Sequence, residues 1–159
     1  MSHEFGKTFL ELKIPPLVIV LVTAGLMWLV ARKTPGFAFL FSVREVFAIG
    51  FAMIGIVTST LGFAAFRRAG TTLNPMTPNS SSALVMEGVY KRTRNPMYLG
   101  FLLILLAWGI FLLNWLTFLL LPLFIAYMNR FQIQPEERAL ASLFGPEFVA
   151  YQAKVRRWF

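Results

Sequence analysis

Two short stretches hold most of the polar side chains that could take part in chemistry. The first, "RTRNPMYLG", carries Arg94, Asn95 and Tyr98, and the second, "QPEER", carries the carboxylates of Glu136 and Glu137. Together these residues offer a guanidinium, an amide, a phenol and two acids, and Asn-Pro before a helix leaves free N–H groups at the helix start. Such a set suits a ligand with an anionic end, hydroxyl groups and a cationic centre.

Each of these residues also has an ordinary structural explanation. Basic residues and tyrosines commonly anchor the ends of membrane helices, and acids are common in the first turn of any helix. Pro96 can simply begin a helix. From the residues alone, we therefore predict a polar pocket at a membrane interface and no particular reaction.

The composition places the chain in a membrane. Of its 159 residues, 57% are hydrophobic and only 14% are charged, whereas soluble chains are about a quarter charged. The chain has no cysteine, and its one histidine, His3, lies near the N-terminus, so we expect no metal site. The net charge of +8 is spread at the ends of apolar runs, which is typical of membrane proteins and argues against nucleic-acid binding.

Three apolar runs predict four membrane segments. Ile14 to Val30 is read as a retained helix and not a cleaved signal, because no small-residue cleavage site follows it. Val46 to Phe66 is long enough to span a bilayer, and its Gly55 and Ser59 have the spacing that lets another helix approach closely. The run 96–129 would be about 50 Å long as one helix, so we expect a hairpin that turns near Asn114, with Pro122 kinking its second helix.

The charges predict the orientation of these segments. With the N-terminus inside, the cytoplasmic side collects twelve of the fifteen Lys and Arg residues. These twelve are Lys7, Lys13, Arg67, Arg68, Lys91, Arg92, Arg94, Arg130, Arg138, Lys154, Arg156 and Arg157, and the other side has Arg32, Lys33 and Arg44. We therefore expect both termini, and the polar pocket, on the cytoplasmic side of a bacterial or archaeal cell membrane.

The predicted fold is an all-α membrane bundle in a single domain, residues 1–159, with an N-terminal helix pair (14–66) and a functional half (67–159). The connection 67–95 is polar and rich in turn-forming residues. The tail is expected to form an amphipathic helix beginning at Pro135 and broken at Gly145-Pro146, lying at the membrane interface. If the last two segments form a hairpin, the stretches around Tyr98 and Glu136 must lie side by side.

The stretch "LVMEGVYKRTRNPMYLG", followed by "PEERALASLFGPEFVAY", resembles the isoprenylcysteine carboxyl methyltransferases and their relatives, the phospholipid methyltransferases. The resemblance covers roughly residues 70–157. It implies a membrane enzyme that transfers a methyl group from S-adenosylmethionine to a lipophilic acceptor. Carried over residue by residue, it implies cofactor contacts at Ser82, Ala83, Leu84, Val85, Tyr90, Asn95, Pro96, Met97, Tyr98, Gly100 and Glu136.

Two departures from the family pattern bear on the acceptor. Asn95 stands where the family usually has histidine, and Gln132 stands where the eukaryotic enzymes have an arginine that contacts substrate. The nearest cation to Gln132 is Arg130. We therefore expect Gln132 and Arg130 to face the acceptor, with Arg130 and Glu137 as the catalytic residues, and a lipid headgroup or small lipophilic molecule to be favoured over a prenylcysteine. The candidate bases are Glu137, Glu87 and water.

Two other functions remain open at this stage. A sterol-type reductase of the membrane shares a similar C-terminal arrangement and would bind NADPH. A small membrane protein without enzymatic activity would bind neither NADPH nor S-adenosylmethionine.

Overall fold

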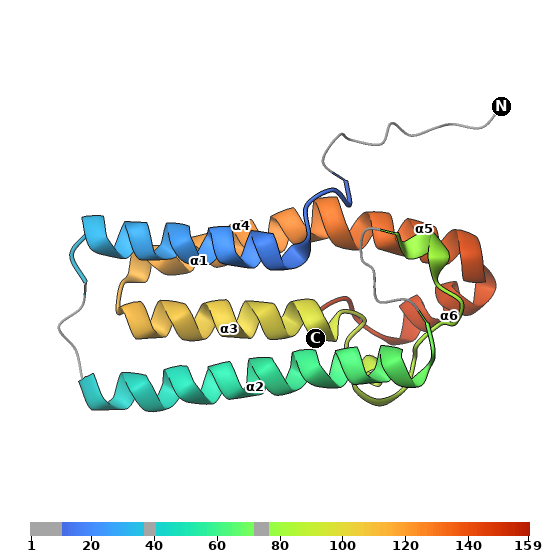
Figure 1. The fold of residues 1–159 in the computed structure, drawn as a ribbon, viewed down its shortest axis with the longest axis horizontal. Coiled ribbons are helices and arrows are strands. Elements are labelled where there is room, and N and C mark those ends of the chain that lie inside the picture. Colours follow the sequence, from blue (N-terminus) through green and yellow to red (C-terminus); the bar gives the residue numbers. More distant parts are fainter. Residues whose placement is uncertain (1–10, 37–40, 72–76) are drawn as a thin grey trace.

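The computed structural model describes residues 11–36, 41–71 and 77–159, and every regular element in these ranges is a helix (Figure 1). His3 and Lys7 lie outside the described residues. The long helices are α1 (Pro16–Lys33), α2 (Phe41–Arg68), α3 (Pro96–Leu112), α4 (Leu120–Tyr127), α5 (Gln134–Phe144) and α6 (Pro146–Lys154). Short helical turns cover Pro78–Ser80 (η1), Gly88–Lys91 (η2), Trp115–Leu119 (η3) and Met128–Ile133 (η4).

The third apolar run folds back on itself, as predicted. Helix α3 ends at Leu112, and Leu113 adopts a left-handed conformation with φ of 50°. The next residue, Asn114, caps η3 by accepting a hydrogen bond from the Leu116 amide at 3.0 Å. Its side-chain amide also donates to the Thr34 hydroxyl at 2.6 Å, which ties this turn to the end of α1. Pro122, where a kink was predicted, lies in the first turn of α4, where a missing N–H costs little.

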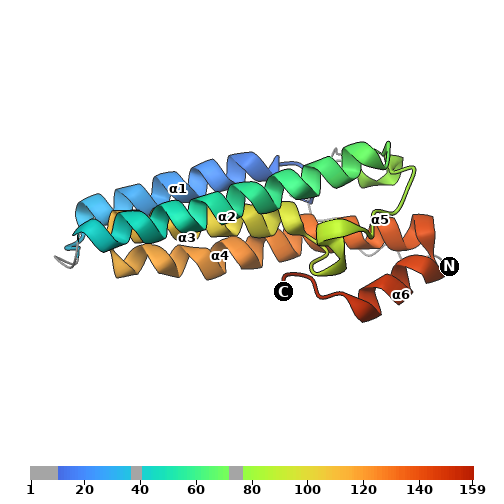
Figure 2. The same cartoon turned by 90° about the horizontal axis from the view of Figure 1, so that it is seen from below.

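The four apolar helices run alongside one another, α1 beside α4 and α3 beside α2 (Figures 1 and 2). Three helical stretches, 16–33, 43–68 and 115–154, are long and apolar enough to cross a membrane, and α3 is a shorter apolar helix. Large hydrophobic side chains are exposed along α1 and α2, among them Leu21 and Val46. Exposed apolar surface on this scale is the surface of a protein that faces lipid.

Helices α2 and α3 approach one another closely at small residues, as the Gly55–Ser59 spacing predicted. A methyl group added to Gly55 would lie 2.7 Å from the carbonyl oxygen of Gly100, so there is room only for a hydrogen atom. The Ser59 hydroxyl donates to the Met97 carbonyl at 3.1 Å across the same contact. Close backbone approach with a polar bond between helices is how membrane helices pack without a hydrophobic driving force.

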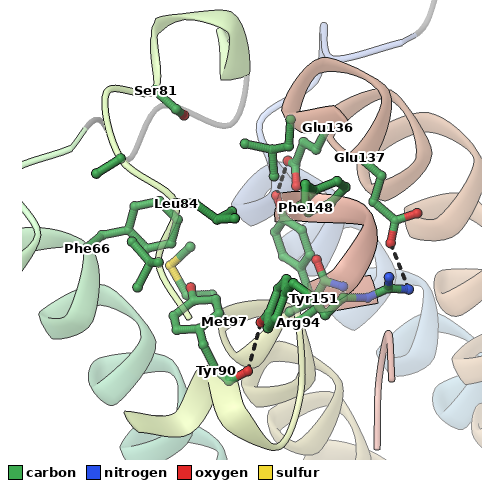
Figure 3. Close-up of a pocket in the computed structure, with 15 residues that line it drawn as sticks. Phe66, Ser81, Leu84, Tyr90, Arg94, Met97, Glu136, Glu137, Phe148 and Tyr151 are labelled. Atoms are coloured by element: carbon green, nitrogen blue, oxygen red, sulfur yellow. Dashed lines mark hydrogen bonds and ion pairs between the residues drawn. The ribbon is translucent and has the colours of Figure 1, made fainter. Parts of the chain in front are cut away.

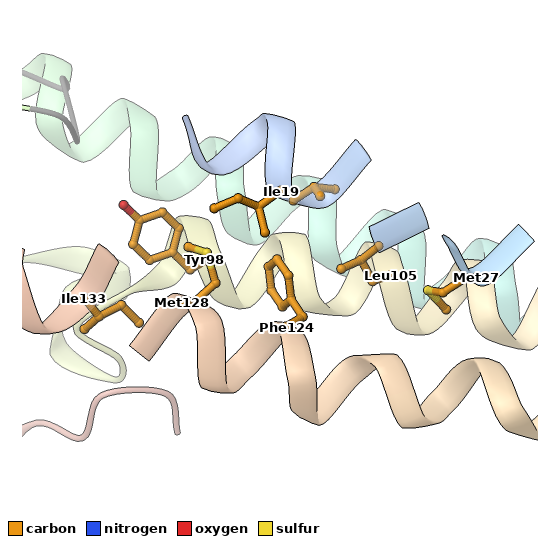
Figure 4. Packing of buried hydrophobic residues seen from close by; sticks show 8 residues of the cluster. Ile19, Met27, Tyr98, Leu105, Phe124, Met128 and Ile133 are labelled. Atoms are coloured by element: carbon orange, nitrogen blue, oxygen red, sulfur yellow. The ribbon is translucent and has the colours of Figure 1, made fainter. Parts of the chain in front are cut away.

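A buried cluster fills the space between α1, α3 and α4 (Figure 4). Ile19 of α1, Leu105 of α3 and Phe124 of α4 meet in the middle of the bundle, and all three are at least nine-tenths buried. Tyr98 and Ile133 close the cluster at the end that carries α5. The core therefore reaches the first turn of α3 and fixes where Tyr98 lies.

Beyond the apolar part, the chain continues from α4 into α5 through a π-helical turn, η4. In this turn the Gln134 amide donates to the Asn129 carbonyl, five residues back instead of four. Helix α5 then ends at Gly145, whose φ of 50° suits glycine, and α6 folds back (Figure 2). The break predicted at Gly145-Pro146 is confirmed.

Candidate active site

A pocket lies where the connection 81–95, the start of α3, and helices α5 and α6 meet (Figure 3). The hairpin of α3 and α4 brings the two polar stretches into this one space, although they are about 40 positions apart in the chain. The pocket is lined by Phe66, Ser81, Ala83, Leu84, Val85, Tyr90, Arg94, Asn95, Met97, Tyr98, Glu136, Glu137, Leu140, Phe148 and Tyr151. Most of the lining is apolar, and the polar groups gather at the α3–α5 side.

The Tyr98 hydroxyl donates a hydrogen bond to Oε1 of Glu136 inside the pocket. Tyr98 is in the first turn of α3, and Glu136 is in the first turn of α5, directly after Pro135. Helix α5 lies beyond the apolar run that ends at Asn129. Burial raises the pKa of Glu136 to about 8, an effect that the Tyr98 hydrogen bond opposes and the nearby Glu137 reinforces.

Glu137 is held very differently from its neighbour. Its Oε1 is 3.1 Å from Nη2 of Arg94 and accepts from Nε of Arg157 at 3.1 Å, and its Oε2 accepts from Nη2 of Arg157 at 2.6 Å. The two guanidiniums occupy both carboxylate oxygens. The acid that faces the pocket with a tyrosine as its partner is therefore Glu136.

Two tyrosines form another wall of the pocket. Tyr90 sits in the η2 turn, packs edge-on against Phe66 with ring centroids 5.5 Å apart, and is only 4% exposed. Its carbonyl accepts a hydrogen bond from the Tyr151 hydroxyl at 2.7 Å. Burial raises the pKa of both phenols, that of Tyr151 to about 12 although Arg94 acts against the change, so both remain neutral hydrogen-bonding groups near pH 7.

The structure brings together most of the residues to which the sequence assigned a role. Ala83, Leu84, Val85, Tyr90, Asn95, Met97, Tyr98, Glu136 and Glu137 all line the pocket. Ser82, Pro96 and Gly100 do not line it. Ser82 is exposed, Pro96 is the buried first residue of α3, and Gly100 faces Ser59 of α2. Gly100 has no side chain, and this lets α3 approach α2 closely.

Arg130 and Gln132 also lie outside the pocket. Nη1 of Arg130 pairs with the carboxylate of Glu11 at 3.0 Å, and Arg138 pairs with the same carboxylate at 2.6 Å. Gln132 is 1% exposed, and its Nε2 donates to the Ile14 carbonyl at 2.5 Å. Both residues thus join the π-helical turn to the chain just before α1, and their predicted contacts with substrate and in catalysis stay predictions.

Sequence reasoning missed several residues of the site. Leu140, Phe148 and Tyr151 were recognisable as an apolar stripe of the tail, but nothing indicated that the stripe would face a pocket. Phe66, at the end of α2, gave no signal beyond its hydrophobicity. Arg157 was one of many basic residues, and its pairing with Glu137 follows only from the return of the chain after α6.

Comparison with known families fits this arrangement. Residues 43–147, which include most of the pocket, match the family model described as phospholipid methyltransferase. The chain belongs to the phospholipid methyltransferase family. It is therefore a methyltransferase of the membrane, built on an all-helical bundle.

Two similar proteins extend the comparison. An uncharacterized protein of Haemophilus influenzae is 53% identical over 62 residues, which cover 39% of this chain and 98% of that protein. The protein-S-isoprenylcysteine O-methyltransferase of Schizosaccharomyces pombe is 32% identical over 120 residues, 74% of this chain and 50% of that protein. This methyltransferase thus spans about half the length of the yeast relative. No solved structure matches the chain.

Proposed function

We propose that this methyltransferase uses S-adenosylmethionine to methylate a lipophilic acceptor at the membrane interface. The observation that carries the proposal is the meeting of Tyr98 and Glu136 in one pocket that both motif stretches line. Those stretches carry the resemblance to the methyltransferases, and the family match spans them. The NADPH-dependent reductase that the sequence left open is not favoured by any particular contact among the described residues of the pocket.

In the proposed complex, the carboxylate of Glu136 holds the ammonium group of the donor. The amides of Met97 and Tyr98, in the first turn of α3, are free of helical partners and suit the donor carboxylate. Tyr90 and Phe66 offer an apolar surface of the kind on which a nucleoside packs. These contacts hold a cationic, polar molecule against a largely apolar wall.

In methyl transfer, the bonds that form and break belong to the donor and the acceptor and not to the protein. The acceptor atom uses a lone pair to form a bond to the methyl carbon while the carbon–sulfur bond breaks. The electron pair of the breaking bond stays on sulfur, which becomes neutral. An amine or thiol acceptor then gives up a proton. Catalysis therefore consists mainly of orienting the two reactants in line and keeping water away from them.

Donor binding can be tested by calorimetry on the purified protein. We expect binding of S-adenosylmethionine by the wild type, with Glu136→Gln and Tyr98→Phe each weakening it about 10- to 150-fold, the cost of losing a contact to a charged group. Glu147→Gln, which removes an exposed carboxylate from α6, is the matched control and should bind normally. Tight binding of NADPH in place of S-adenosylmethionine would overturn the proposal.

For the acceptor, we propose a groove next to the pocket, on the other side of Leu84 and Val85. The groove lies between the last turns of α2 and the segment 84–89, and it shares Leu84 and Val85 with the pocket. Leu61, Ala64 and Ala65 make its α2 wall, while Arg68 and Glu87 are its charged residues. An amphiphile with its apolar part toward Leu61 and its headgroup near this pair would stand next to the methyl donor. Glu87, the acid among the described groove residues, is then placed to accept a proton.

The groove lies beyond the contact of α2 with α3 at Gly55 and Gly100, where the two backbones leave no room for an acceptor between them. Filling the groove with Ala65→Trp should raise the KM for the lipophilic acceptor at least tenfold and leave the affinity for S-adenosylmethionine unchanged. Ile49→Trp, on the exposed face of the same helix, is the control. Equal acceptor kinetics in the two variants would rule out the groove.

A methyl-transfer assay with labelled donor should compare bacterial lipid extracts with farnesylcysteine analogues. We expect lipid products to dominate, because the proposed groove offers both a cation, Arg68, and an acid, Glu87, a set that suits a zwitterionic headgroup better than a lone carboxylate. Faster methylation of the prenylcysteine than of every lipid fraction would overturn this choice of acceptor.

A further inference from the structure

The chain after α6 returns to the N-terminal end of α3 and contacts residues 93–95, the turn that precedes this helix. The Arg94 amide donates to the Arg156 carbonyl at 3.0 Å. The Arg157 carbonyl then accepts from two side chains, Nδ2 of Asn95 at 2.9 Å and the hydroxyl of Thr93 at 3.2 Å. Asn95 does not cap α3 with its side chain, so its amide orientation is set by this carbonyl.

The side chain of Arg157 acts on the opposite wall. Its guanidinium makes two hydrogen bonds to the carboxylate of Glu137, at 3.1 and 2.6 Å, next to the contact of Arg94 with the same acid. The side chains of Glu137 and Arg94 are 14% and 13% exposed and that of Arg157 is 31% exposed, so the carboxylate itself is largely shielded from water. Ion pairs with two hydrogen bonds and little solvent hold their geometry far better than surface pairs.

A third contact fixes the end of this segment. Nε1 of Trp158 donates to Oδ1 of Asn129 at 3.0 Å, in the π-helical turn. Residues 156–158 therefore join three parts of the molecule: the turn before α3, the start of α5 and the turn that follows α4. These are the parts that carry Asn95, Glu137 and the approach to Glu136.

We infer that Arg157 is a positioning residue for the methyl-donor site. It does not line the pocket, but its carbonyl orients Asn95 and its guanidinium holds the Glu137 carboxylate through two hydrogen bonds at the pocket wall. Glu136 is thereby left as the acid, among the described residues of the pocket, that can receive a cation. The inference rests on the proposed use of the pocket for S-adenosylmethionine.

The test replaces Arg157 by glutamine and by lysine in the full-length protein. Arg157→Gln should raise the Kd and the KM for S-adenosylmethionine about tenfold, while kcat at saturating donor changes less than about twofold. Arg157→Lys keeps the charge and should recover part of the affinity. Arg156→Gln is the matched control, since it removes the same charge from the preceding residue, whose side chain is exposed.

A purely structural role would act otherwise. It would lower the melting temperature and the amount of active protein, and hence the apparent kcat, without moving the KM for the donor. Normal donor affinity in Arg157→Gln would overturn the inference. A wild type that does not bind S-adenosylmethionine would instead overturn the proposed function, so the two failures are distinguishable.

A double-mutant cycle shows whether Arg157 works through Glu137. If it does, the variant with both Glu137→Gln and Arg157→Gln should bind the donor no more weakly than the worse of the two single variants. Effects that multiply would show that the two residues act independently and would overturn the route through Glu137. Should Arg157→Gln fail to fold, Arg157→Lys and Glu137→Gln still give a comparison of donor affinity against the wild type.

Discussion

Neighbouring acids with opposite surroundings define the site at the scale of single residues. Glu136 has a tyrosine as its partner in a largely apolar pocket, whereas Glu137 has two guanidiniums. Desolvation favours the neutral form of the Glu136 carboxyl group. Adjacent positions of α5 thus hold one carboxylate against a tyrosine and the other in ion pairs with two arginines.

The raised pKa of Glu136 predicts how stability depends on pH. The pKa of its carboxyl group is about 8 in the folded chain against 4.5 for an unperturbed group, so the folded state binds this proton more tightly than the unfolded state does. The resulting stabilisation is complete below about pH 4.5 and is lost as the pH rises through about 8. We expect the melting temperature to fall by several degrees between pH 6 and 9, and to fall less in Glu136→Gln, as measured by scanning fluorimetry in detergent.

Glu147→Gln serves as the control and should keep the pH dependence of the wild type. A melting curve of Glu136→Gln that falls as steeply as that of the wild type would show that another group is responsible.

The same pKa predicts proton release when the donor binds. The ammonium of S-adenosylmethionine favours the ionised form of Glu136, so binding near pH 7 should expel a proton from this carboxyl group. Calorimetry in buffers that differ in ionisation enthalpy measures the number of protons released. We expect a value approaching one for the wild type and near zero for Glu136→Gln. Tyr98, Tyr90 and Glu137 also face the carboxyl group, and burial raises the pKa of Tyr90 so that it stays neutral in this range.

The sequence indicated Tyr98 and Glu136 because each lies in a recognisable motif at the start of a helix. It did not indicate Arg157, because the pairing with Glu137 depends on how α6 returns after Gly145. That path is set by tertiary contacts such as the Tyr151 hydroxyl on the Tyr90 carbonyl, 61 residues away in the chain, and not by any local pattern.

At the scale of elements, the contact between α2 and α3 supports the pocket from the membrane side. Gly55, Ser59 and Gly100 let the two backbones meet, and the Ser59 bond to the Met97 carbonyl holds the first turn of α3. The same turn carries Tyr98. A shift of α2 against α3 would therefore move the residue that orients Glu136.

Adding one methyl group tests this contact. In Gly100→Ala the new carbon would meet backbone of α2, including the Ser59 nitrogen at 2.9 Å, so the helices must separate. Overpacking of this kind costs about 1–3 kcal/mol, and we expect a melting temperature lower by several degrees together with weaker donor binding.

Gly50→Ala provides the matched control, because nothing lies within 4 Å of the added carbon and alanine is the better helix former. It should be neutral or stabilising. Equal melting temperatures for the two variants would mean that α2 and α3 pack less tightly than described.

Helix existence, the hairpin near Asn114 and the close approach at Gly55 were all predictable, since apolar length, turn residues and small-residue spacing are local signals. The π-helical character of 128–133 was not, because it depends on contacts with the chain before α1. Leu12 donates to the Phe131 carbonyl at 3.0 Å, and Gln132 reaches the Ile14 carbonyl.

Across the whole molecule, most of the described cations lie at the end of the bundle that carries the pocket. Arg32, Lys33 and Arg44 lie at the other end, where Arg44 donates to the Phe111 carbonyl at 3.3 Å. We propose on the positive-inside rule that the pocket faces the cytoplasm.

Cysteine labelling in cells tests this orientation, and the chain has no native cysteine to interfere. Lys33→Cys, at the exposed end of α1, should react with a membrane-impermeant thiol reagent added from outside. Ser80→Cys, exposed in η1 near the pocket, should react only after the membrane is opened. The reverse pattern would invert the orientation.

The turn between Met128 and Ile133 also sets the direction in which the site points. An α-helix rotates about 100° per residue, so one residue accommodated in a wider turn rotates every later side chain by about that angle relative to a regular helix. Deleting a single residue here would let the helix close up and would swing the Glu136 carboxylate away from Tyr98, with every functional side chain still present. The angular phase between the lipid-embedded bundle and its reactive end is thus encoded in the number of residues, which makes this turn less tolerant of length changes than of changes in residue type.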